Sequence, residues 1–269
     1  MESISVPDHE TASRLSAACG APVEVYSVEQ ARGAVIICPG GGYMWRSPRE
    51  GAPVARAMNG LGLYAFVLQY ACEPTPLGNQ PLRTLARAVA VVRAHAAKLG
   101  FPADRIAVCG FSAGGHLAAS LGVFWQNAEH FDPGADLNAH RPDALILAYP
   151  VITAGTFAHR GCMNRLAGAD CAGQAAWSLE QYVTHQTPPA FLWHTAEDRD
   201  VPCQNSLLFT QALVQAGVAC ELHLYPHGVH GLSLATPEVE EPEKGRIADA
   251  HVASWVGQLQ AWLDNLWGV

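Results

Sequence analysis

Short apolar segments alternate with longer amphipathic ones along most of this 269-residue chain. The apolar segments are rich in β-branched and aromatic residues, and a glycine-rich or polar turn follows each of them. They are almost continuously apolar, as expected for strands that helices cover on both faces. The order predicts an α/β fold with a mostly parallel sheet, and Val23–Tyr26 is expected to add an antiparallel edge strand. The expected parallel strands are residues 35–38, 64–70, 105–109, 144–149, 189–194 and 221–225.

Two long segments show helical spacing. The first carries an apolar stripe with steps of three and four, and Gly100 follows it as a C-terminal stop. The stripe consists of Leu82, Leu85, Val89, Val92, Ala96 and Leu99. The second, residues 251–267, is expected to be a last helix whose tryptophans belong to the core. We interpret residues 1–269 as a single domain with no separate lid. In it, residues 236–244 form a solvated acidic loop, and the connections 125–141 and 153–188 could shape an entrance.

Composition narrows the classes of protein. Hydrophobic residues make up 49 % of the chain and charged residues 15 %, which is typical of a compact fold with a large core. The formal charge is −8 and the 16 lysines and arginines form no basic cluster, so a nucleic acid partner is not expected. The eight cysteines include no Cys-x-x-Cys pair and are interpreted as buried thiols. No secretory leader or membrane anchor is visible at the start, which favours a cytoplasmic protein.

One motif follows an expected strand without a gap. Residues 110–114 read Gly-Phe-Ser-Ala-Gly, come directly after the strand at 105–109, and open a helix of small residues. Gly-x-Ser-x-Gly alone is weak, and a buried strand that ends in an ordinary glycine turn is the alternative. The strand–turn–helix setting is that of a nucleophile elbow, which exposes the Ser112 hydroxyl and places the Ala113 N–H at a helix N-terminus. We therefore predict that Ser112 is a nucleophile.

A glycine loop follows an earlier strand. Residues 39–43 read Pro-Gly-Gly-Gly-Tyr, and glycines let backbone N–H groups approach a substrate oxygen closely. Gly41 and Gly42 are therefore candidate oxyanion donors beside Ala113. A phosphate-binding loop is disfavoured, because both the Gly-Lys-Ser/Thr ending and the Gly-x-Gly-x-x-Gly spacing are lacking. Two aromatic residues after the glycines are expected to line the acyl or alcohol pocket, although ordinary packing is an equal alternative for the second: Tyr43 and Trp45.

A candidate acid follows the strand at 189–194. A serine nucleophile needs a base and an acid that orients the base, and in this kind of fold they follow in the order serine, acid, histidine. Glu197, Asp198 and Asp200 all lie in the loop. We favour Asp198 because it stands at the turn itself, while the apolar residues after it can pack the loop back on the sheet. Glu197 and Asp200 remain alternatives.

Two histidines compete as the base after the strand at 221–225. His230 is favoured because it lies at the loop apex beside Gly231, whereas His227 is close enough to the strand to cap its end. His223, His227 and His230 also have three- and four-residue spacing, which suits a metal site only on a helix. Since this segment looks like a strand and then a loop, no metal site is expected.

At these residues the chain resembles the bacterial α/β-hydrolase esterases related to acetyl esterases and acetylxylan esterases, relatives of hormone-sensitive lipase and prolyl oligopeptidase. Beyond the elbow the resemblance covers residues 37–43, 47–51, 65–68, 105–106, 149–151, 188–194 and 227–231. It implies the α/β-hydrolase fold and a carboxylesterase for short acyl esters, with acetyl groups on carbohydrates as a candidate substrate. It also implies that Ser112, Asp198 and His230 form the catalytic triad.

The chain departs from that family pattern at three positions. Ala71 stands where an arginine usually follows the tyrosine, Thr84 stands where an aspartate is common, and Pro39 opens the glycine loop where lipases often have histidine. None of these changes removes a catalytic group, but Ala71 bears on the entrance.

Two other functions stay open. A serine peptidase of the same fold would use the same triad, but the chain has no propeller domain and no evident pocket for a peptide amino terminus. A non-catalytic ligand-binding protein on a hydrolase scaffold would normally have lost the nucleophile or the base. The expected partner is a small-molecule ester, with no cofactor, metal or membrane involved. A homo-oligomer remains open.

Overall fold

The computed structural model describes residues 9–268, which are built around a seven-stranded sheet in the order β1-β3-β2-β4-β5-β6-β7. β1 (Val23–Tyr26) pairs antiparallel with β3, and every other pair of neighbouring strands is parallel. The parallel strands are β2 (Gly33–Cys38), β3 (Leu63–Leu68), β4 (Ile106–Phe111), β5 (Ala144–Ala148), β6 (Ala190–Thr195) and β7 (Cys220–Tyr225). The mostly parallel sheet and the antiparallel edge strand predicted from the sequence are confirmed.

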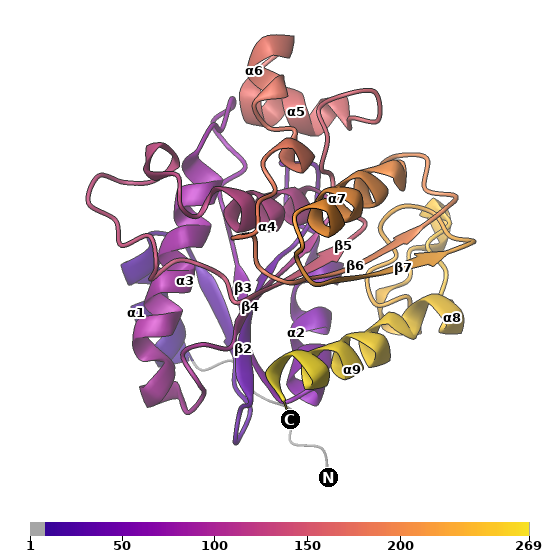
Figure 1. Cartoon of the computed structure of the whole chain (residues 1–269). Coiled ribbons are helices and arrows are strands. Elements are labelled where there is room, and N and C mark those ends of the chain that lie inside the picture. Colours follow the sequence, from indigo (N-terminus) through magenta and orange to yellow (C-terminus); the bar gives the residue numbers. More distant parts are fainter. Residues whose placement is uncertain (1–8, 269) are drawn as a thin grey trace.

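Helices cover both faces of this sheet (Figure 1). On one face lie α1 (His9–Cys19), α3 (Gln80–Leu99), α4 (Ala113–Phe124) and α7 (Gln204–Gln215). On the other lie α2 (Ala52–Gly60), α8 (Ala250–Ala253) and α9 (Trp255–Trp267). Alternate strand residues therefore enter different cores, as Ile36 and Ile37 do, and this is why the strands read as continuously apolar. No helix within residues 9–268 has the length and apolar character needed to cross a membrane.

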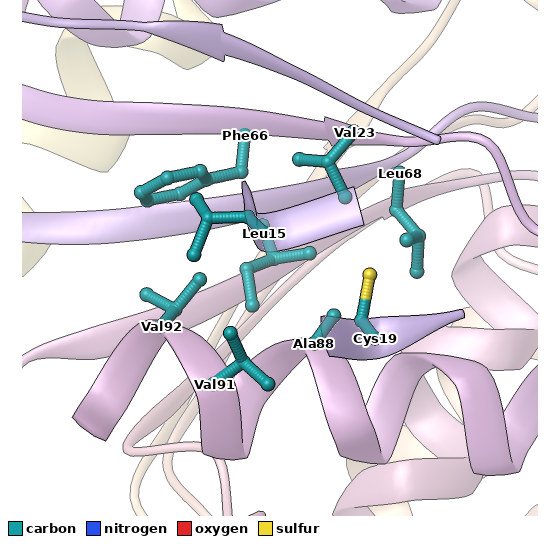
Figure 2. Close-up of a pocket in the computed structure, with 9 residues that line it drawn as sticks. Leu15, Cys19, Val23, Phe66, Leu68, Ala88, Val91 and Val92 are labelled. Atoms are coloured by element: carbon teal, nitrogen blue, oxygen red, sulfur yellow. The ribbon is translucent and has the colours of Figure 1, made fainter. Parts of the chain in front are cut away.

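The apolar stripe of α3 packs on the sheet as predicted, and Gly100 ends the helix in the left-handed conformation. Between α3, α1 and the sheet lies a small cavity with a volume of about 10 Å³, shown in Figure 2. Its lining is apolar and includes Leu15, Phe66 and Val92, whose side chains point toward one another. A space of this size holds about one water molecule, so it is a gap in helix–sheet packing and not a ligand site.

Several sequence predictions differ in detail from the structure. The strand expected over 64–70 ends at Leu68, and the side chain of Gln69 just beyond it bonds Arg46 and Glu24. The helix expected over 251–267 is broken at Ser254, with Asp249 capping its short first part. Cysteines are mostly buried as predicted, but the thiol of one in α6 (Cys171–Ala175) is exposed and that of one at the start of β7 is half-buried.

The acidic segment 236–244 is largely exposed, as its composition predicted, but it is more than an open loop. It forms two short 3-10 turns, η4 (Pro237–Val239) and η5 (Pro242–Lys244), each of which begins with proline. Val239 is buried, and its carbonyl accepts a hydrogen bond of 2.6 Å from Nε of Arg49. Glu241 in turn faces Arg49 (3.2 Å) and Arg246 (2.5 Å). Buried apolar surface and paired charges therefore hold this segment on the protein.

Of the two long connections, only 153–188 reaches the glycine loop. It carries α5 (Arg160–Ala167), α6 and the 3-10 turn η3 (Leu179–Gln181), and Figure 1 shows α5 and α6 above the sheet. The carbonyl of Arg165 accepts the N–H of Leu77 (2.9 Å), and the guanidinium of Arg165 contacts the sulfur of Met44 (3.1 Å). The connection 125–141, with η2 (Ala128–His130), packs on α3 through Arg83 and Arg93.

Candidate active site

Ser112 occupies a sharp turn between β4 and α4. Its backbone has φ 54° and ψ −117°, a strained conformation for a residue with a side chain. A Cβ on Gly110 would lie 2.1 Å from the carbonyl oxygen of Gly114, and a Cβ on Gly114 would lie 2.0 Å from that of Cys38. The two glycines of the motif are therefore required by the close crossing of strand, helix and glycine loop.

The side chains of Ser112, His230 and Asp198 are connected by hydrogen bonds. Ser112 Oγ lies 2.8 Å from His230 Nε2, and His230 Nδ1 lies 2.6 Å from Asp198 Oδ2. A carboxylate can only accept, so Nδ1 carries the proton and Nε2 is free to accept the proton of the serine hydroxyl. This arrangement suits a serine that attacks as the histidine removes its proton.

Asp198 is held by four donors. Its Oδ1 accepts the N–H groups of Asp200 (3.0 Å) and Val201 (2.9 Å), and its Oδ2 faces His230 and, at 3.3 Å, Nε2 of His194. Burial raises the pKa of this carboxyl, but the hydrogen bonds of His194 and His230, the charge of His230 and the Val201 N–H together hold it well below its usual range. Asp198 is therefore ionised at neutral pH.

The competing acid and base lie outside this series. Nδ1 of His227 bonds Oε1 of Glu197 at 3.0 Å, and the His227 side chain is 75 % exposed. Asp200 is exposed and approaches Asp198 through its backbone N–H. The structure thus brings Asp198 and His230 to Ser112, and neither Glu197, Asp200 nor His227. Within residues 9–268, no three His, Cys, Asp or Glu side chains gather as they would around a metal ion.

Two arginines fix the loop that carries His230. Nε of Arg246 donates to the carbonyl of His230 (2.9 Å), and Nη1 of Arg49 donates to that of Gly231 (2.8 Å). Gly231 has φ +82°, and a Cβ there would lie 2.9 Å from the Arg246 guanidinium, so only glycine suits this position. The imidazole of His230 also meets the ring of Tyr149 edge-on, with centroids 5.1 Å apart.

Three buried side chains hold the glycine loop. The Tyr70 hydroxyl donates to the Pro39 carbonyl (2.6 Å), the Gly40 N–H donates to Oε2 of Glu50 (2.7 Å), and the Tyr43 hydroxyl meets Nδ1 of His116 (3.0 Å). Gly41 and Gly42 follow with φ values of +128° and +66°, in the region that favours glycine. The loop touches the nucleophile, because a Cβ on the preceding Gly40 would lie 3.0 Å from Cβ of Ser112.

The remaining oxyanion candidate, Ala113, is the first residue of α4. The N–H groups of a helix's first turn have no acceptor within the helix and can bind an anion. The Ala113 N–H thus lies at the same turn as Ser112, and the glycine loop packs beside that turn. The two segments that carry the predicted donors therefore adjoin the nucleophile, and the role of these N–H groups stays a prediction.

The expectation for Tyr43 needs correction, whereas Trp45 stays available to a substrate. Tyr43 is only 1 % exposed, since its ring packs edge-on against Tyr70 and its hydroxyl is used by His116. It supports the glycine loop from within the core. Trp45 is 42 % exposed, and its neighbour Met44 is exposed as well.

Four buried polar residues around the site received no role from the sequence: Glu50, His116, Tyr149 and His194. Glu50 and Tyr149 appeared only inside segments of resemblance. Their hydrogen bond joins positions 99 apart in the chain, so no short spacing could indicate it. The one local signal was an acidic residue in the segment that follows the glycine loop.

Residues 81–261, which include Ser112, Asp198 and His230, match the prolyl oligopeptidase family. Endo-1,4-beta-xylanase B of Butyrivibrio fibrisolvens is 38 % identical over 77 % of this chain and 33 % of its own length. The acetylxylan esterase of Xylanibacter ruminicola is 30 % identical over 76 % of this chain and 42 % of its own length. The chain spans between 33 % and 50 % of the length of the curated relatives it matches.

Solved structures are similar over most of their length. An acetyl ester-xyloside bifunctional hydrolase from Caldicellulosiruptor lactoaceticus has 37 % identity and a TM-score of 0.79, covering 91 % of this chain and 88 % of that one. A carboxylesterase from Lactobacillus plantarum has 30 % identity and a TM-score of 0.78, covering 91 % and 92 %. An alpha/beta hydrolase enzyme from a deep-sea metagenome library has 30 % identity and a TM-score of 0.73, covering 93 % and 94 %.

Proposed function

The chain belongs to the prolyl oligopeptidase family, and from this premise we propose that it is a serine carboxylesterase for short-chain acyl esters. Its sheet and its solved relatives confirm the α/β-hydrolase fold expected from the sequence. The observation that carries the proposal is the hydrogen-bonded series from Ser112 Oγ (2.8 Å) through His230 to Asp198 (2.6 Å) at a nucleophile elbow. Relatives named as esterases and carboxylic ester hydrolases support it.

The proposed reaction is acyl transfer in two steps. Ser112 Oγ attacks the ester carbonyl as His230 Nε2 takes its proton, and the tetrahedral intermediate then expels the alcohol, which receives that proton. Water next attacks the acyl-enzyme with His230 again as base, releasing the carboxylic acid and restoring Ser112. Asp198 stabilises the imidazolium that forms in each step, which its ionised state at neutral pH permits.

The oxyanion is assigned to backbone donors. We propose that the N–H groups of Gly41, Gly42 and Ala113 stabilise the negative charge on the former carbonyl oxygen, since the glycine loop and the first turn of α4 both adjoin Ser112. Donors of this kind are fixed before the reaction begins, because Glu50, Tyr70 and other buried groups already hold the loop. Loss of one such donor typically costs about 10²- to 10³-fold in kcat.

The favoured substrates carry acetyl groups on a sugar. One relative is named an acetylxylan esterase and a solved relative an acetyl ester-xyloside bifunctional hydrolase, and the exposed Trp45 beside the glycine loop is available to contact a sugar ring. A peptidase is the second candidate, and the family match itself favours it.

A fluorophosphonate probe followed by substrate comparison tests the proposal. The protein is labelled, the adduct is mapped, and hydrolysis is measured for nitrophenyl esters of increasing chain length, an acetylated xylo-oligosaccharide and a prolyl anilide. We expect an adduct on Ser112, fastest turnover of acetyl esters, and loss of both in Ser112→Ala. Ser254→Ala, at an exposed serine on the far helix pair, is the matched control. Full ester hydrolysis by Ser112→Ala would refute the mechanism, and faster anilide than ester cleavage would assign a peptidase.

A further inference from the structure

Glu50 is a buried carboxylate next to the glycine loop, which is unusual because glutamate is almost never fully buried unless it is paired. It is 3 % exposed, and both of its oxygens accept hydrogen bonds. Oε2 accepts from the Gly40 N–H at 2.7 Å, and Oε1 accepts from the Tyr149 hydroxyl at 2.6 Å. Its neighbour Arg49 points elsewhere, to Glu241 at 3.2 Å. The Glu50 side chain is therefore committed to two groups that both belong to the site.

On one side, Glu50 fixes Gly40 against the nucleophile. A Cβ on Gly40 would lie 2.8 Å from Oε2 of Glu50 and 3.0 Å from Cβ of Ser112, so the Gly40 backbone fills the space between them. Gly40 directly precedes Gly41 and Gly42. The direction of their N–H groups depends on how the Gly40 peptide is held, because successive peptide planes share a Cα atom.

On the other side, Glu50 reaches the loop of His230 through Tyr149. The Tyr149 hydroxyl donates to Glu50 and accepts the N–H of Ser233 at 3.0 Å, while the Tyr149 ring meets the imidazole of His230 edge-on with centroids 5.1 Å apart. The backbone of Tyr149 has φ 37°, a conformation that residues other than glycine rarely adopt. One carboxylate thus connects the glycine loop with the loop that carries His230.

We propose that Glu50 is a positioning residue for acyl transfer, which orients the backbone donors of the glycine loop toward Ser112 and, through Tyr149, the imidazole of His230. This proposal rests on the proposed function, since the orientation of these donors matters only if an oxyanion forms at Ser112. A charged acceptor holds an N–H more strongly than a neutral one, so an ionised carboxylate suits this role better than an amide would. The negative charge also favours the imidazolium state of His230.

Burial has the largest effect on the Glu50 carboxyl and leaves its pKa above the usual value, although the Tyr149 hydroxyl, the Gly40 N–H and the charges of His230 and Arg49 act to lower it. An amide has one acceptor oxygen where Glu50 uses two, so Glu50→Gln loses one of these hydrogen bonds and should unfold at a somewhat lower urea concentration than the wild type. The role of Glu50 is therefore judged on kcat, KM and the rate of labelling of the folded variants.

The test measures kcat and KM for nitrophenyl acetate in Glu50→Gln, Glu50→Leu and Tyr149→Phe. We expect kcat to fall between about 10- and 100-fold in the two Glu50 variants, less in Gln than in Leu, with KM changed less than about threefold. Tyr149→Phe should lower kcat by about 10-fold, and adding it to Glu50→Gln should lower kcat little further, because both act through one connection. If Glu50→Leu fails to fold, the Gln variant decides alone.

A matched pair elsewhere provides the control. The hydroxyl of Tyr26 donates to Oε2 of Glu24 at 3.0 Å on the β1 edge of the sheet, so Glu24→Gln and Tyr26→Phe make the same chemical changes outside the site. Both should leave kcat unchanged. A Glu50→Gln enzyme with wild-type kcat, or with only KM altered, would overturn the inference.

The rate at which a fluorophosphonate labels Ser112 separates this inference from the proposed function. Labelling needs the nucleophile and the oxyanion donors but no ester. A wild type that is labelled yet hydrolyses no ester refutes the proposed function, and the labelling rate of Glu50→Gln then decides the role of Glu50. We expect that rate to fall by about the same factor as kcat, and an unchanged rate would contradict the role.

Discussion

The buried imidazole of His194 lies 3.3 Å from Oδ2 of Asp198, the oxygen that also faces His230. Nε2 of His194 is in addition 2.9 Å from the carbonyl of Val201, while its Nδ1 lies 2.8 Å from the hydroxyl of Ser206. Two acceptors at Nε2 place the proton there, and the serine can donate to Nδ1, so a neutral ring satisfies every contact. His194 therefore helps to hold the acid in place.

Asp198→Asn should lower kcat/KM for acetyl esters by roughly 10³- to 10⁴-fold. An amide in this place can donate to Nδ1 of His230, which would leave the proton on Nε2 and face the Ser112 hydroxyl with a donor. Steady-state kinetics measure the effect. Asp200→Asn is the control and should change the rate less than threefold; the reverse pattern would reassign the acid.

His230→Ala should abolish ester turnover, because among the described side chains His230 supplies the imidazole that bonds Ser112. His227→Ala should keep at least about half of the wild-type rate, since that side chain is 75 % exposed and pairs with Glu197. The two variants are compared with the same nitrophenyl ester. Turnover in the His230 variant with loss in the His227 variant would identify the other histidine as the base.

Gly110→Ala should destabilise the fold by about 3 kcal/mol or more, because the new Cβ would lie 2.1 Å from the Gly114 carbonyl and neither backbone can yield. Gly42→Ala meets no atom within 4 Å but has φ +66°, which costs about 1–2 kcal/mol. Urea unfolding measures both. Gly257→Ala, in the first turn of α9 where an added Cβ meets no atom within 4 Å, should instead stabilise by up to about 1 kcal/mol. Equal effects at the three positions would contradict the close crossing at the elbow.

Stability should decline between pH 6.5 and about 4 on account of His116. Burial lowers the pKa of this histidine from 6.5 to about 4, although its bond to the Trp177 carbonyl acts the other way. As the pH falls through this window, His116 becomes protonated in the unfolded chain but stays neutral in the folded one. Below about pH 4 it is protonated in both states, so the stability falls no further on its account. The loss amounts to about 3 kcal/mol. His116→Gln should flatten this part of the curve of unfolding free energy against pH, and parallel curves would refute it.

Local signals predicted the parts of the site that stand directly after strands. Ser112, Asp198 and His230 each follow an apolar segment at the carboxyl edge of a parallel sheet, and chain order sufficed to bring them together. The glycines of the loops could also be predicted, because a backbone that approaches another closely or adopts a positive φ requires glycine at that position. The spacing of Trp255 and Leu259 alone predicted a core helix, although no pattern in the sequence indicated the break at Ser254.

The residues that hold the site were beyond such signals. Glu50 carries a charge that pattern analysis assigns to the surface, and only the tertiary fold supplies the Gly40 N–H and the Tyr149 hydroxyl. Tyr43 was assigned to a pocket wall because it follows the glycines, whereas the turn at positive φ directs its ring into the core. The charges at 236–244 predicted an exposed segment. They gave no sign that Glu241 pairs with Arg49 and Arg246, because only the tertiary fold brings Arg49 to it.

Hydrogen bonds of Arg49 link the loop of His230 to the segment that carries Glu50. Its guanidinium donates to the carbonyls of Gly231 and Val239, and its own carbonyl accepts the hydroxyl of Ser233, one position away from the Glu50 that holds the glycine loop. A fluctuation that releases the loop of His230 must break these bonds and so loosens the glycine loop too. We therefore expect the site to open as one cooperative unit, in which the base and the oxyanion donors lose their order together.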